Sequence, residues 1–432
     1  MNLVELQPDE YMAFALKHPY YSFTQDIKFA ELKKFNNWKS VLLGLKDKDR
    51  ILGASLFLIK ELPLNKKIYY APHGLLIDYS DHELVKTMTL ELKKYMKKKG
   101  AIFFKIEPYL MKVRRDNEAE IVENDIDNRG DYDYLKKLGF IEVNGDNVKG
   151  RLKRKWQYVL DIENKTFDEL FNNMDSSKRR KYRQNIDLGI KIKKLDLNDI
   201  ELFYNIMENT STRKGFASRE KEYYEKMLSL YSDTMKINYA YFDCDETIKK
   251  LQSNIDNLSL ELNDLKEKNS KRSKAKNRIK LLEEDITRFN KQIDTFKDYQ
   301  KEGNTVPLSA VLFIETPQEL IAFIGGTFEK YTGYAPFYNL IIDTIKEATL
   351  KGKKQYNFYG INEKPNPEGK DYNLYFFKKG FNGEVRELFG EFDYPVNKLM
   401  YFLYNVAFNT RLFISKFKIK IKKLFYKKQK RY

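Results

Sequence analysis

Two dense groups of basic side chains in this 432-residue sequence have the composition of phosphate-binding surfaces. The first lies between Ser176 and Arg183, where five of eight positions are Lys or Arg. Its members are Lys178, Arg179, Arg180, Lys181 and Arg183. The second, Lys266 to Arg278, includes Lys271 and Arg272. Such clusters bind phosphate without reading sequence, so we expect both to bind nucleic acid. A solvated surface is the alternative for any single member.

Side chains suited to covalent or metal chemistry are scarce. The chain has one cysteine and three scattered histidines, which argues against a disulfide framework, a thiolate metal cluster and an all-histidine zinc site. We find no Ser–His–Asp or Cys–His pattern, and we predict no metal and no cofactor. Glu107 precedes Pro108 at the end of an expected strand, a place where an acid can face a cleft.

Two matched apolar ladders predict a helical hairpin. The first reads Ile248, Leu251, Ile255, Leu258, Leu262, Leu265, and the second reads Ile279, Leu282, Ile286, Phe289, Ile293, Phe296. Their alternating steps of three and four are the spacing of a coiled-coil seam. The polar run between them predicts an antiparallel turn. Strand-like flanks at 235–244 and 307–328 indicate an insertion inside a sheet-containing domain.

Outside the hairpin, one plan occurs twice. Strand, strand, helix and strand are expected over 51–106 and again over 308–359, and each set is followed by a helix running into Gly-Phe. This closing unit is typical of acetyltransferase-like (GNAT) folds, and the order indicates mixed α/β layering. We therefore predict two tandem GNAT-like domains with an inserted hairpin. The expected boundaries are 1–153 for the first domain, 154–245 with 303–400 for the second, 246–302 for the hairpin, and 401–432 for a C-terminal helix and basic tail.

The turns that would hold coenzyme A do not fit that cofactor. Coenzyme A enzymes of this fold hold the pyrophosphate on backbone N–H groups of a Gly-rich turn. The corresponding turns here, Ala71–Leu75 and Tyr331–Pro336, each contain a single Gly with bulky neighbours. This argues against the hypothesis of a coenzyme A-dependent N-acyltransferase, which remains an alternative function.

Charge is concentrated at the C-terminal end. The net charge is +17, and residues 411–432 contain ten Lys or Arg and no acid. Because aromatic and apolar residues alternate with these charges, the tail suits an anionic membrane surface. The amino terminus lacks a signal peptide's basic-then-apolar order, and no apolar run approaches the roughly 18 residues of a membrane span. We expect a cytoplasmic protein, peripheral at the inner face of the plasma membrane.

Several local motifs resemble those of the Fem (FemABX) family, which transfers amino acids from tRNA into peptidoglycan cross-bridges. Thr24–Lys33 followed by Asn36–Trp38 is similar to the family's opening, and Phe104–Pro108 to its strand ending in an acid–Pro pair. Lys214–Arg219 with Tyr223 matches its R-x-x-x-Y segment. The most specific match is Leu374–Phe381 leading to Gly390–Asp393, which resembles F-K-x-x-F … G-x-x-D. The resemblance covers nearly the whole chain.

The resemblance implies an aminoacyltransferase. Glycine, serine or alanine esterified to the 3′ end of a tRNA would move onto an amino group of the peptidoglycan stem peptide. The acceptor would be lipid II, favoured by the hairpin and the basic tail, or a soluble UDP-linked precursor. A non-catalytic adaptor that binds RNA or membrane through the hairpin and tail is a second alternative, which leaves the cleft motifs unexplained.

The resemblance also implies acceptor-binding residues. Lys33 and Arg219 match positions that contact the acceptor's pyrophosphate, and Tyr223 would share the face of Arg219. From the sequence alone, without the family resemblance, Lys33 would be interpreted as a solvated helix residue and Tyr223 as a packing residue. Glu107 would hold or deprotonate the incoming ammonium. The family acid here is Asp, and its upstream Tyr partner is replaced by Ile102, so a plain salt bridge is the alternative.

Lys378 would bind the terminal tRNA phosphates or stabilise charge that develops on the ester oxygen. Its neighbour Phe377 would pack, against the terminal adenine or in the core. Since an aminoacyl ester is already activated, positioning of two substrates would supply most of the acceleration, and we expect no covalent enzyme intermediate.

Overall fold

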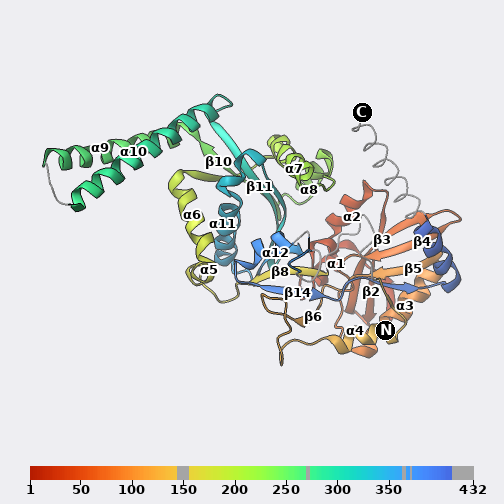
Figure 1. Cartoon of the computed structure of the whole chain (residues 1–432). Coiled ribbons are helices and arrows are strands. Elements are labelled where there is room, and N and C mark those ends of the chain that lie inside the picture. The colour runs from red at the N-terminus through yellow and green to blue at the C-terminus, as the bar shows by residue number, and fades with distance from the viewer. Residues whose placement is uncertain (144–154, 269–272, 362–365, 370–371, 411–432) are drawn as a thin grey trace, which may run out of the picture. The chain divides into compact units, whose positions relative to one another are not determined.

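The computed structural model describes residues 1–143, 155–268, 273–361, 366–369 and 372–410. These residues form two compact units (Figure 1). Unit 1 comprises Met1–Asp161, Thr316–Gln318 and the chain from Asn357 onward, and unit 2 comprises Ile162–Glu315 and Glu319–Tyr356. Each unit contains strands and helices, so the predicted mixed α/β class is confirmed.

Unit 1 is built mainly on a seven-stranded sheet in the order β1-β2-β3-β4-β5-β15-β7. These strands are β1 (Asn2–Glu5), β2 (Lys39–Asp47), β3 (Arg50–Leu62), β4 (Lys66–Ala71), β5 (Ala101–Ile106), β7 (Ile141–Glu142) and β15 (Phe392–Pro395). Its helices are α1 (Pro8–Ala15), α2 (Ile27–Lys34), α3 (His82–Lys98), α4 (Arg129–Lys137) and α12 (Tyr372–Lys379). α3 connects β4 to β5. These two strands run parallel, and parallel neighbours need a crossover connection such as this helix. Its apolar face, including Met88 and Leu92, is buried in the core of the unit.

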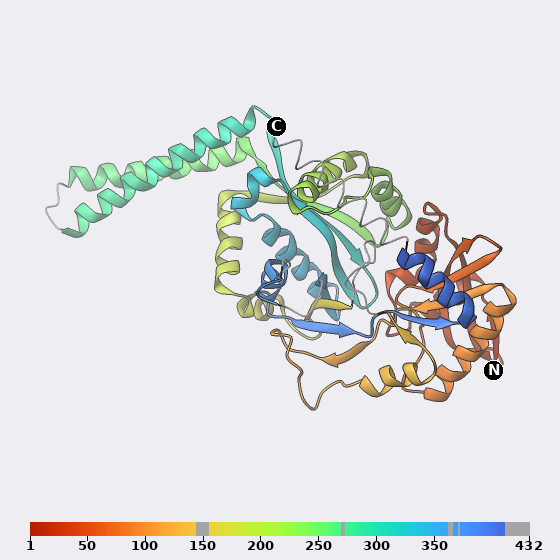
Figure 2. The same ribbon diagram turned by 45° about the vertical axis from the view of Figure 1, so that its right-hand side comes forward.

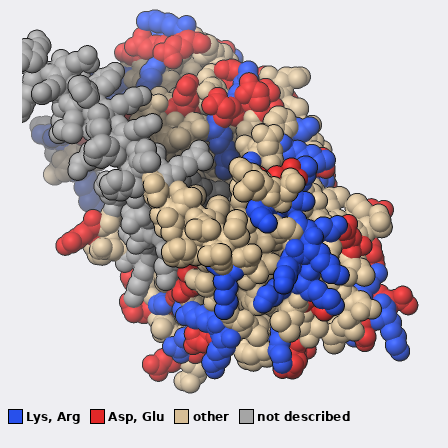
Figure 3. All heavy atoms as spheres, turned by 90° about the vertical axis from the view of Figure 1, so that its right-hand side faces the viewer, with Lys and Arg blue, Asp and Glu red and all other residues tan. Residues whose placement is uncertain are grey.

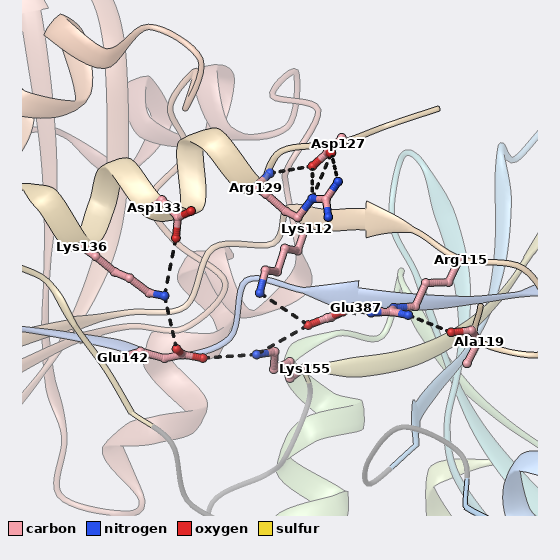
Figure 4. A network of polar contacts seen from close by, with 10 residues as sticks. All are labelled: Lys112, Arg115, Ala119, Asp127, Arg129, Asp133, Lys136, Glu142, Lys155 and Glu387. Carbon is pink, nitrogen blue, oxygen red and sulfur yellow. Dashed lines mark hydrogen bonds and ion pairs between the residues drawn. The ribbon is translucent and has the colours of Figure 1, made fainter. Parts of the chain in front are cut away.

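A second group of strands completes unit 1. β6 (Met111–Arg114) and β8 (Trp156–Asp161) each pair antiparallel with β14 (Glu384–Leu388), which lies between them. Figure 4 shows the ion pairs beside these strands, centred on Glu387. Arg115 donates from Nε and Nη2 to Oε2 of Glu387 at 3.0 and 2.7 Å, and Lys112 and Lys155 lie within 3.9 Å of its Oε1.

The strand pairing corrects the expected domain boundaries. Residues 303–400 were assigned to the second domain, but β15 pairs with β5 and β7 inside the sheet of unit 1. β8 likewise belongs to unit 1, although residue 154 was the expected start of the second domain. The pairing of strands far apart in sequence decides these boundaries, and local periodicity carries no signal for it.

Residues 398–410 form a helix on unit 1. Its inner face packs on the sheet, where the rings of Tyr401 and Tyr404 lie 5.2 and 5.3 Å from that of Phe103. Figure 3 views the side of the molecule on which this helix lies, and there Lys and Arg side chains border an area without charge on its right and below it. The predicted basic tail, 411–432, lies outside the described residues.

Unit 2 contains four strands that lie side by side in the order β12-β11-β10-β9. They are β9 (Ile190–Lys194), β10 (Met235–Asp243), β11 (Thr305–Glu315) and β12 (Glu319–Thr327). Its helices, apart from the hairpin, are α5 (Phe167–Asn173), α6 (Ser176–Leu188), α7 (Ile200–Lys214), α8 (Lys221–Leu230) and α11 (Phe337–Leu350). α7 packs closely on β12, because a side chain at Gly326 would meet Thr210. β13 (Gln355–Ile361) runs across the boundary between the units.

The predicted hairpin is confirmed. α9 (Cys244–Glu267) and α10 (Ser273–Gln300) run side by side and extend away from the strands of unit 2 (Figures 1 and 2). All twelve ladder residues are buried or half-buried, whereas the off-ladder Leu260 and Leu281 are exposed. The hairpin joins β10 to β11, which pair with each other from Met235 opposite Ile314 to Asp243 opposite Thr305. It therefore replaces a turn between two adjacent strands.

Candidate functional site

Lys378 is a buried lysine at the end of α12. The residue is 5% exposed, and its Nζ donates to the carbonyl oxygens of Tyr359 at 3.2 Å and Gly360 at 2.7 Å. Burial lowers the pKa of Lys378 from 10.5 to about 7, because desolvation disfavours the ammonium form. A lysine with such a pKa can give or take a proton near neutrality. The neighbouring Phe377 packs edge-on against Phe381, with ring centres 5.4 Å apart.

Glu107 is also buried in unit 1, at the end of β5, and accepts a hydrogen bond of 2.7 Å from the phenol of Tyr70. Sequence reasoning noted that Ile102 stands where the family has a tyrosine, and it missed Tyr70. Tyr70 comes from β4, which runs parallel to β5 and pairs Ala71 with Ile106. Only this register brings the two side chains together. The lysine two positions before Glu107, Lys105, forms ion pairs with Glu391 and Asp393.

The turn after β4 uses its backbone groups internally. The N–H of Gly74 donates to the carbonyl of Ala71, and the N–H of Leu75 donates to the phenol of Tyr79. The Pro72 carbonyl accepts hydrogen bonds from Gln25 and Thr24. The amide donors that would hold a pyrophosphate are therefore engaged, which agrees with the sequence argument against coenzyme A.

Lys33 lies in the last turn of α2, where its Nζ sits 4.8 Å from the centre of the Phe29 ring. Asp26 caps the other end of this helix by accepting from the N–H of Lys28 at 2.8 Å. Lys33 is half-buried, whereas the adjacent Lys34 is exposed and pairs with Glu31. The structure thus separates the two adjacent lysines that the sequence presented as equivalent.

Arg219 and Tyr223 lie together in unit 2, but Arg219 precedes the first residue of α8, so the two do not share one helical turn as the spacing predicted. The Arg219 guanidinium lies 4.4 Å from the centre of the Tyr223 ring, at the start of α8. A guanidinium stacked on an aromatic face keeps its planar fork of donors oriented for an anion. Both side chains are half-buried.

The basic residues of α6 do not form one uniform surface. Lys178 is 4% exposed and pairs with Asp175 at 3.2 Å, so it differs from the solvent-facing phosphate ligand that we expected. Arg180 and Arg183 are exposed, while Arg179 and Lys181 are half-buried. The tyrosine within the cluster, Tyr182, donates to Asp343 at 2.6 Å and ties the helix to α11. With about 3.6 residues per helical turn, side chains at five of eight successive positions cannot all face outward. The count of charges did not take this into account.

Near the hairpin tip, acids offset part of the positive charge. Ion pairs join Arg278 to Glu261, Lys266 to Glu283 and Lys268 to Asp264. The predicted tRNA contacts Lys271 and Arg272 lie outside the described residues.

The described residues offer neither a metal-ion cluster nor a membrane-spanning helix. No group of three or more His, Cys, Asp or Glu there is arranged to hold a metal ion. Within the same residues, no helix is both long and apolar enough to cross a membrane.

Comparison with known proteins connects these features. The model of the FemAB family matches residues 6–409. The aminoacyltransferase FemA of Staphylococcus aureus (strain bovine RF122 / ET3-1) is 33% identical over 413 residues, which cover 94% of this chain and 97% of that protein. FemA of strain N315 matches with the same identity and coverage.

The fold also matches a solved structure. The crystal structure of FemX superposes with a TM-score of 0.77 at 24% identity, covering 93% of this chain and 99% of FemX. The predicted fold class and the resemblance read from the motifs are both confirmed. This chain belongs to the FemAB family.

Proposed function

We propose that this chain is an aminoacyltransferase that moves an amino acid from aminoacyl-tRNA to an amino group of a peptidoglycan precursor. The observation that carries the proposal is the 33% identity, over 94% of the chain, to enzymes named aminoacyltransferase FemA. Two buried ionisable groups of unit 1, Lys378 and Glu107, supply side chains for the proton transfers. The engaged N–H groups after β4 argue against coenzyme A as the donor.

In the proposed reaction, the acceptor nitrogen attacks the ester carbonyl carbon, a C–N bond forms, and the bond to the ribose 3′ oxygen breaks. Glu107 takes a proton from the acceptor ammonium so that the neutral amine can attack. Lys378 stabilises the developing negative charge and gives a proton to the departing 3′ oxygen. The attacking nitrogen loses its second proton as the amide forms, and that proton restores the Lys378 ammonium. Because the ester is already activated, alignment of the two substrates lowers much of the barrier.

Substrate binding is assigned to three other places. In the proposal, Lys33 and the stacked pair of Arg219 and Tyr223 bind the acceptor's phosphates. The outward residues of α6 bind the tRNA phosphates, while Phe377 mainly packs. The proposed acceptor is lipid II. The UDP-linked precursor is the alternative acceptor, and the assay below includes both.

The decisive experiment is a transfer assay with purified protein. Transfer RNA charged with glycine, serine or alanine is supplied separately with lipid II or with the UDP-linked precursor, and mass spectrometry measures the stem peptide. We expect one pair of substrates to yield a peptide longer by one residue. The absence of any extended peptide in every arm, or tight binding of acetyl-CoA by calorimetry, would overturn the proposal.

Variants locate the chemistry. Lys378→Met should abolish transfer, whereas Lys379→Met is the matched control, since Lys379 is its neighbour on α12 and pairs with Glu118. Arg219→Ala should raise the KM for the acceptor. If both Lys378→Met and Arg219→Ala retain full transfer activity, the roles proposed for these two residues are wrong.

We also propose that the protein binds the anionic inner face of the membrane through the helix at 398–410 and the segment after it. The outward face of this helix carries Leu399, Phe402, Leu403 and Val406, which are 49–68% exposed. Their spacing places them in one stripe along the helix. After Asp393 the sequence contains no acid, and ten basic residues follow from Arg411 onward. An apolar stripe followed by basic charge suits a bilayer of anionic lipid.

Vesicle flotation tests this binding. Protein should float with vesicles of phosphatidylglycerol and phosphatidylcholine, and less with phosphatidylcholine alone. Phe402→Ser combined with Leu403→Ser should reduce flotation several-fold. Leu350→Ser, at an exposed leucine of unit 2, is the control and should float like the original protein. Equal flotation of all three proteins would refute the role of the stripe.

A further inference from the structure

The two carbonyl groups that hold Lys378 belong to an unusual turn of β13. Tyr359 has φ = 65°, in the left-handed region that residues with a Cβ rarely adopt. The carbonyls of Tyr359 and of the next residue, Gly360, accept both hydrogen bonds from Nζ of Lys378. The orientation of the lysine thus depends on a backbone conformation that costs free energy and needs support from its surroundings.

That support comes from Asn357. Its side-chain Oδ1 accepts a hydrogen bond of 2.7 Å from the N–H of Tyr359, two residues later, which is the local turn that Asn side chains favour. Asn357 is fully buried. Its Nδ2 donates to Oε1 of Gln157 and to the phenol oxygen of Tyr109, both at 3.0 Å. With its acceptor and its donors engaged, the amide has a single orientation.

The two residues that hold Asn357 are fixed in turn. The Tyr109 phenol donates to Oε1 of Gln157 at 3.3 Å, and Gln157 is 1% exposed on β8. The Tyr109 ring stacks on the His73 ring, with centres 4.5 Å apart and planes 24° apart. The His73 ring is held at Nδ1 by the Ser22 hydroxyl at 2.7 Å. All of these residues belong to unit 1.

We propose that Asn357, held by Gln157 and Tyr109, is a positioning residue for Lys378: it keeps Tyr359 in the left-handed conformation and so keeps the two carbonyl acceptors on the ammonium group. The inference deepens the proposed function and rests on it for the importance of Lys378. None of these three supporting residues belongs to a motif that the sequence analysis used.

Asn357 fits this task better than other residues of its size. Leu would supply neither the acceptor nor the donors. Asp would keep the acceptor for the Tyr359 N–H but would place a carboxylate against Oε1 of Gln157. Without the side-chain acceptor, the Tyr359 N–H loses its partner at this turn, and the backbone can relax to negative φ. The Tyr359 and Gly360 carbonyls would then rotate away from Lys378.

Loss of the carbonyl acceptors should change how Lys378 titrates. Burial holds its pKa at about 7, and removing two hydrogen-bond acceptors from the ammonium form lowers the pKa further. The ionisable neighbours on α12 are Tyr375, whose hydroxyl donates to the Asn117 carbonyl, and Lys379, which pairs with Glu118. These contacts do not involve Asn357 and stay in place in the variant.

The test compares Asn357→Ala with a rescued double variant, Asn357→Ala with Tyr359→Gly. Glycine adopts φ = 65° without strain, so it needs no brace. We expect Asn357→Ala to lower kcat by about 100-fold, as misplacement of a catalytic group by about 1 Å can do, with little change in KM for either substrate. Relative to Asn357→Ala, the double variant should recover at least about tenfold.

Two readouts separate positioning from a loss of folded protein. In Asn357→Ala the limb of the pH–rate profile assigned to Lys378 should move to lower pH, and the double variant should move it back. The pH dependence of acetic anhydride labelling at Lys378, read by peptide mass spectrometry, should shift in the same way without any transfer assay. Thr344→Ala is the control for lost buried hydrogen bonds, because Thr344 lies on α11 of unit 2 and hydrogen-bonds the buried Tyr356 hydroxyl of the same unit.

An unchanged labelling profile in Asn357→Ala, or no recovery in the double variant, would overturn the inference. If the original protein transfers no amino acid at all, the proposed function fails. The labelling profile still decides the positioning role of Asn357 in that case, so the two failures are distinguishable.

Discussion

Replacement of Lys378 by Met should make the protein more stable at neutral pH while abolishing transfer. The reason is that a buried lysine resists carrying its charge. The pKa of Lys378 falls from 10.5 to about 7, a difference of about 3.5 units, and each unit corresponds to about 1.4 kcal/mol. Below pH 7, keeping this buried lysine protonated therefore lowers the free energy of unfolding by at most about 5 kcal/mol.

Methionine removes that cost and fills a similar volume, but it donates no hydrogen bond. The carbonyls of Tyr359 and Gly360 lose their donor, which costs about 3 kcal/mol for the two together. The net stabilisation of Lys378→Met at pH 7 is then about 2 kcal/mol. Buried functional groups commonly stand in such a trade-off between stability and activity.

The dependence on pH has a fixed sign. Between pH 7 and about 10.5 the unfolded chain holds the Lys378 proton and the folded protein does not, so the stability of the original protein rises with pH by about 1.4 kcal/mol per unit. The stability of Lys378→Met does not rise with pH in this way, because the variant has no lysine at this position to titrate. Its advantage should shrink as pH rises and reverse between pH 8 and pH 9, by roughly the same slope.

Urea unfolding of both proteins at about pH 6.5, 7.5, 8.5 and 9.5 measures the difference in the free energy of unfolding. Lys379→Met is the control, and its difference from the original protein should not depend on pH in this way. If Lys378→Met is less stable at pH 7 and the difference stays constant up to pH 9.5, the reasoning about burial is wrong. Those pH values span roughly the window between the folded and unfolded pKa values.

Two further predictions concern the scaffold. Arg115→Met leaves the buried carboxylate of Glu387 with only the more distant lysines (Figure 4), and it should lower the free energy of unfolding by about 3 kcal/mol in a urea titration; a change near zero would show that the lysines suffice. Gly326→Ala would place a Cβ 2.3 Å from Oγ1 of Thr210, so it should lower the melting temperature by several degrees, about 1–3 kcal/mol in stability. Gly333→Ala, whose Cβ meets nothing within 4 Å, is the matched control and should melt with the original protein.

The elements with strong periodicity could be read from the sequence. The two ladders of the hairpin form helices as predicted, and the crossover helix at His82–Lys98 and the strand at Ala101–Ile106 complete the strand, strand, helix and strand expected over 51–106. Local patterns suffice there because each residue's burial follows from its own helical or strand period. The four-residue spacing also predicted that Arg219 and Tyr223 meet, but Arg219 precedes α8, so the contact forms at the entry to the helix and not within one helical turn.

Contacts that depend on pairing between distant strands could not be read. Tyr70 meets Glu107 because β4 and β5 run parallel in one particular register. β15 joins the sheet of unit 1 although about 250 residues separate it from β7. The inward position of Lys178 depends on how α6 packs, which the count of basic residues in the cluster did not reveal.

The sequence by itself determined the family, the fold class and the hairpin, because motifs and hydrophobic periods are local properties of the chain. The tertiary structure alone decided the state of Lys378. Burial sets its pKa near neutrality, and the left-handed Tyr359 with its Asn357 brace sets its direction. Solvation and orientation are properties of the assembled surroundings, so a lysine in a motif acquires a pKa near neutrality only after those surroundings have formed.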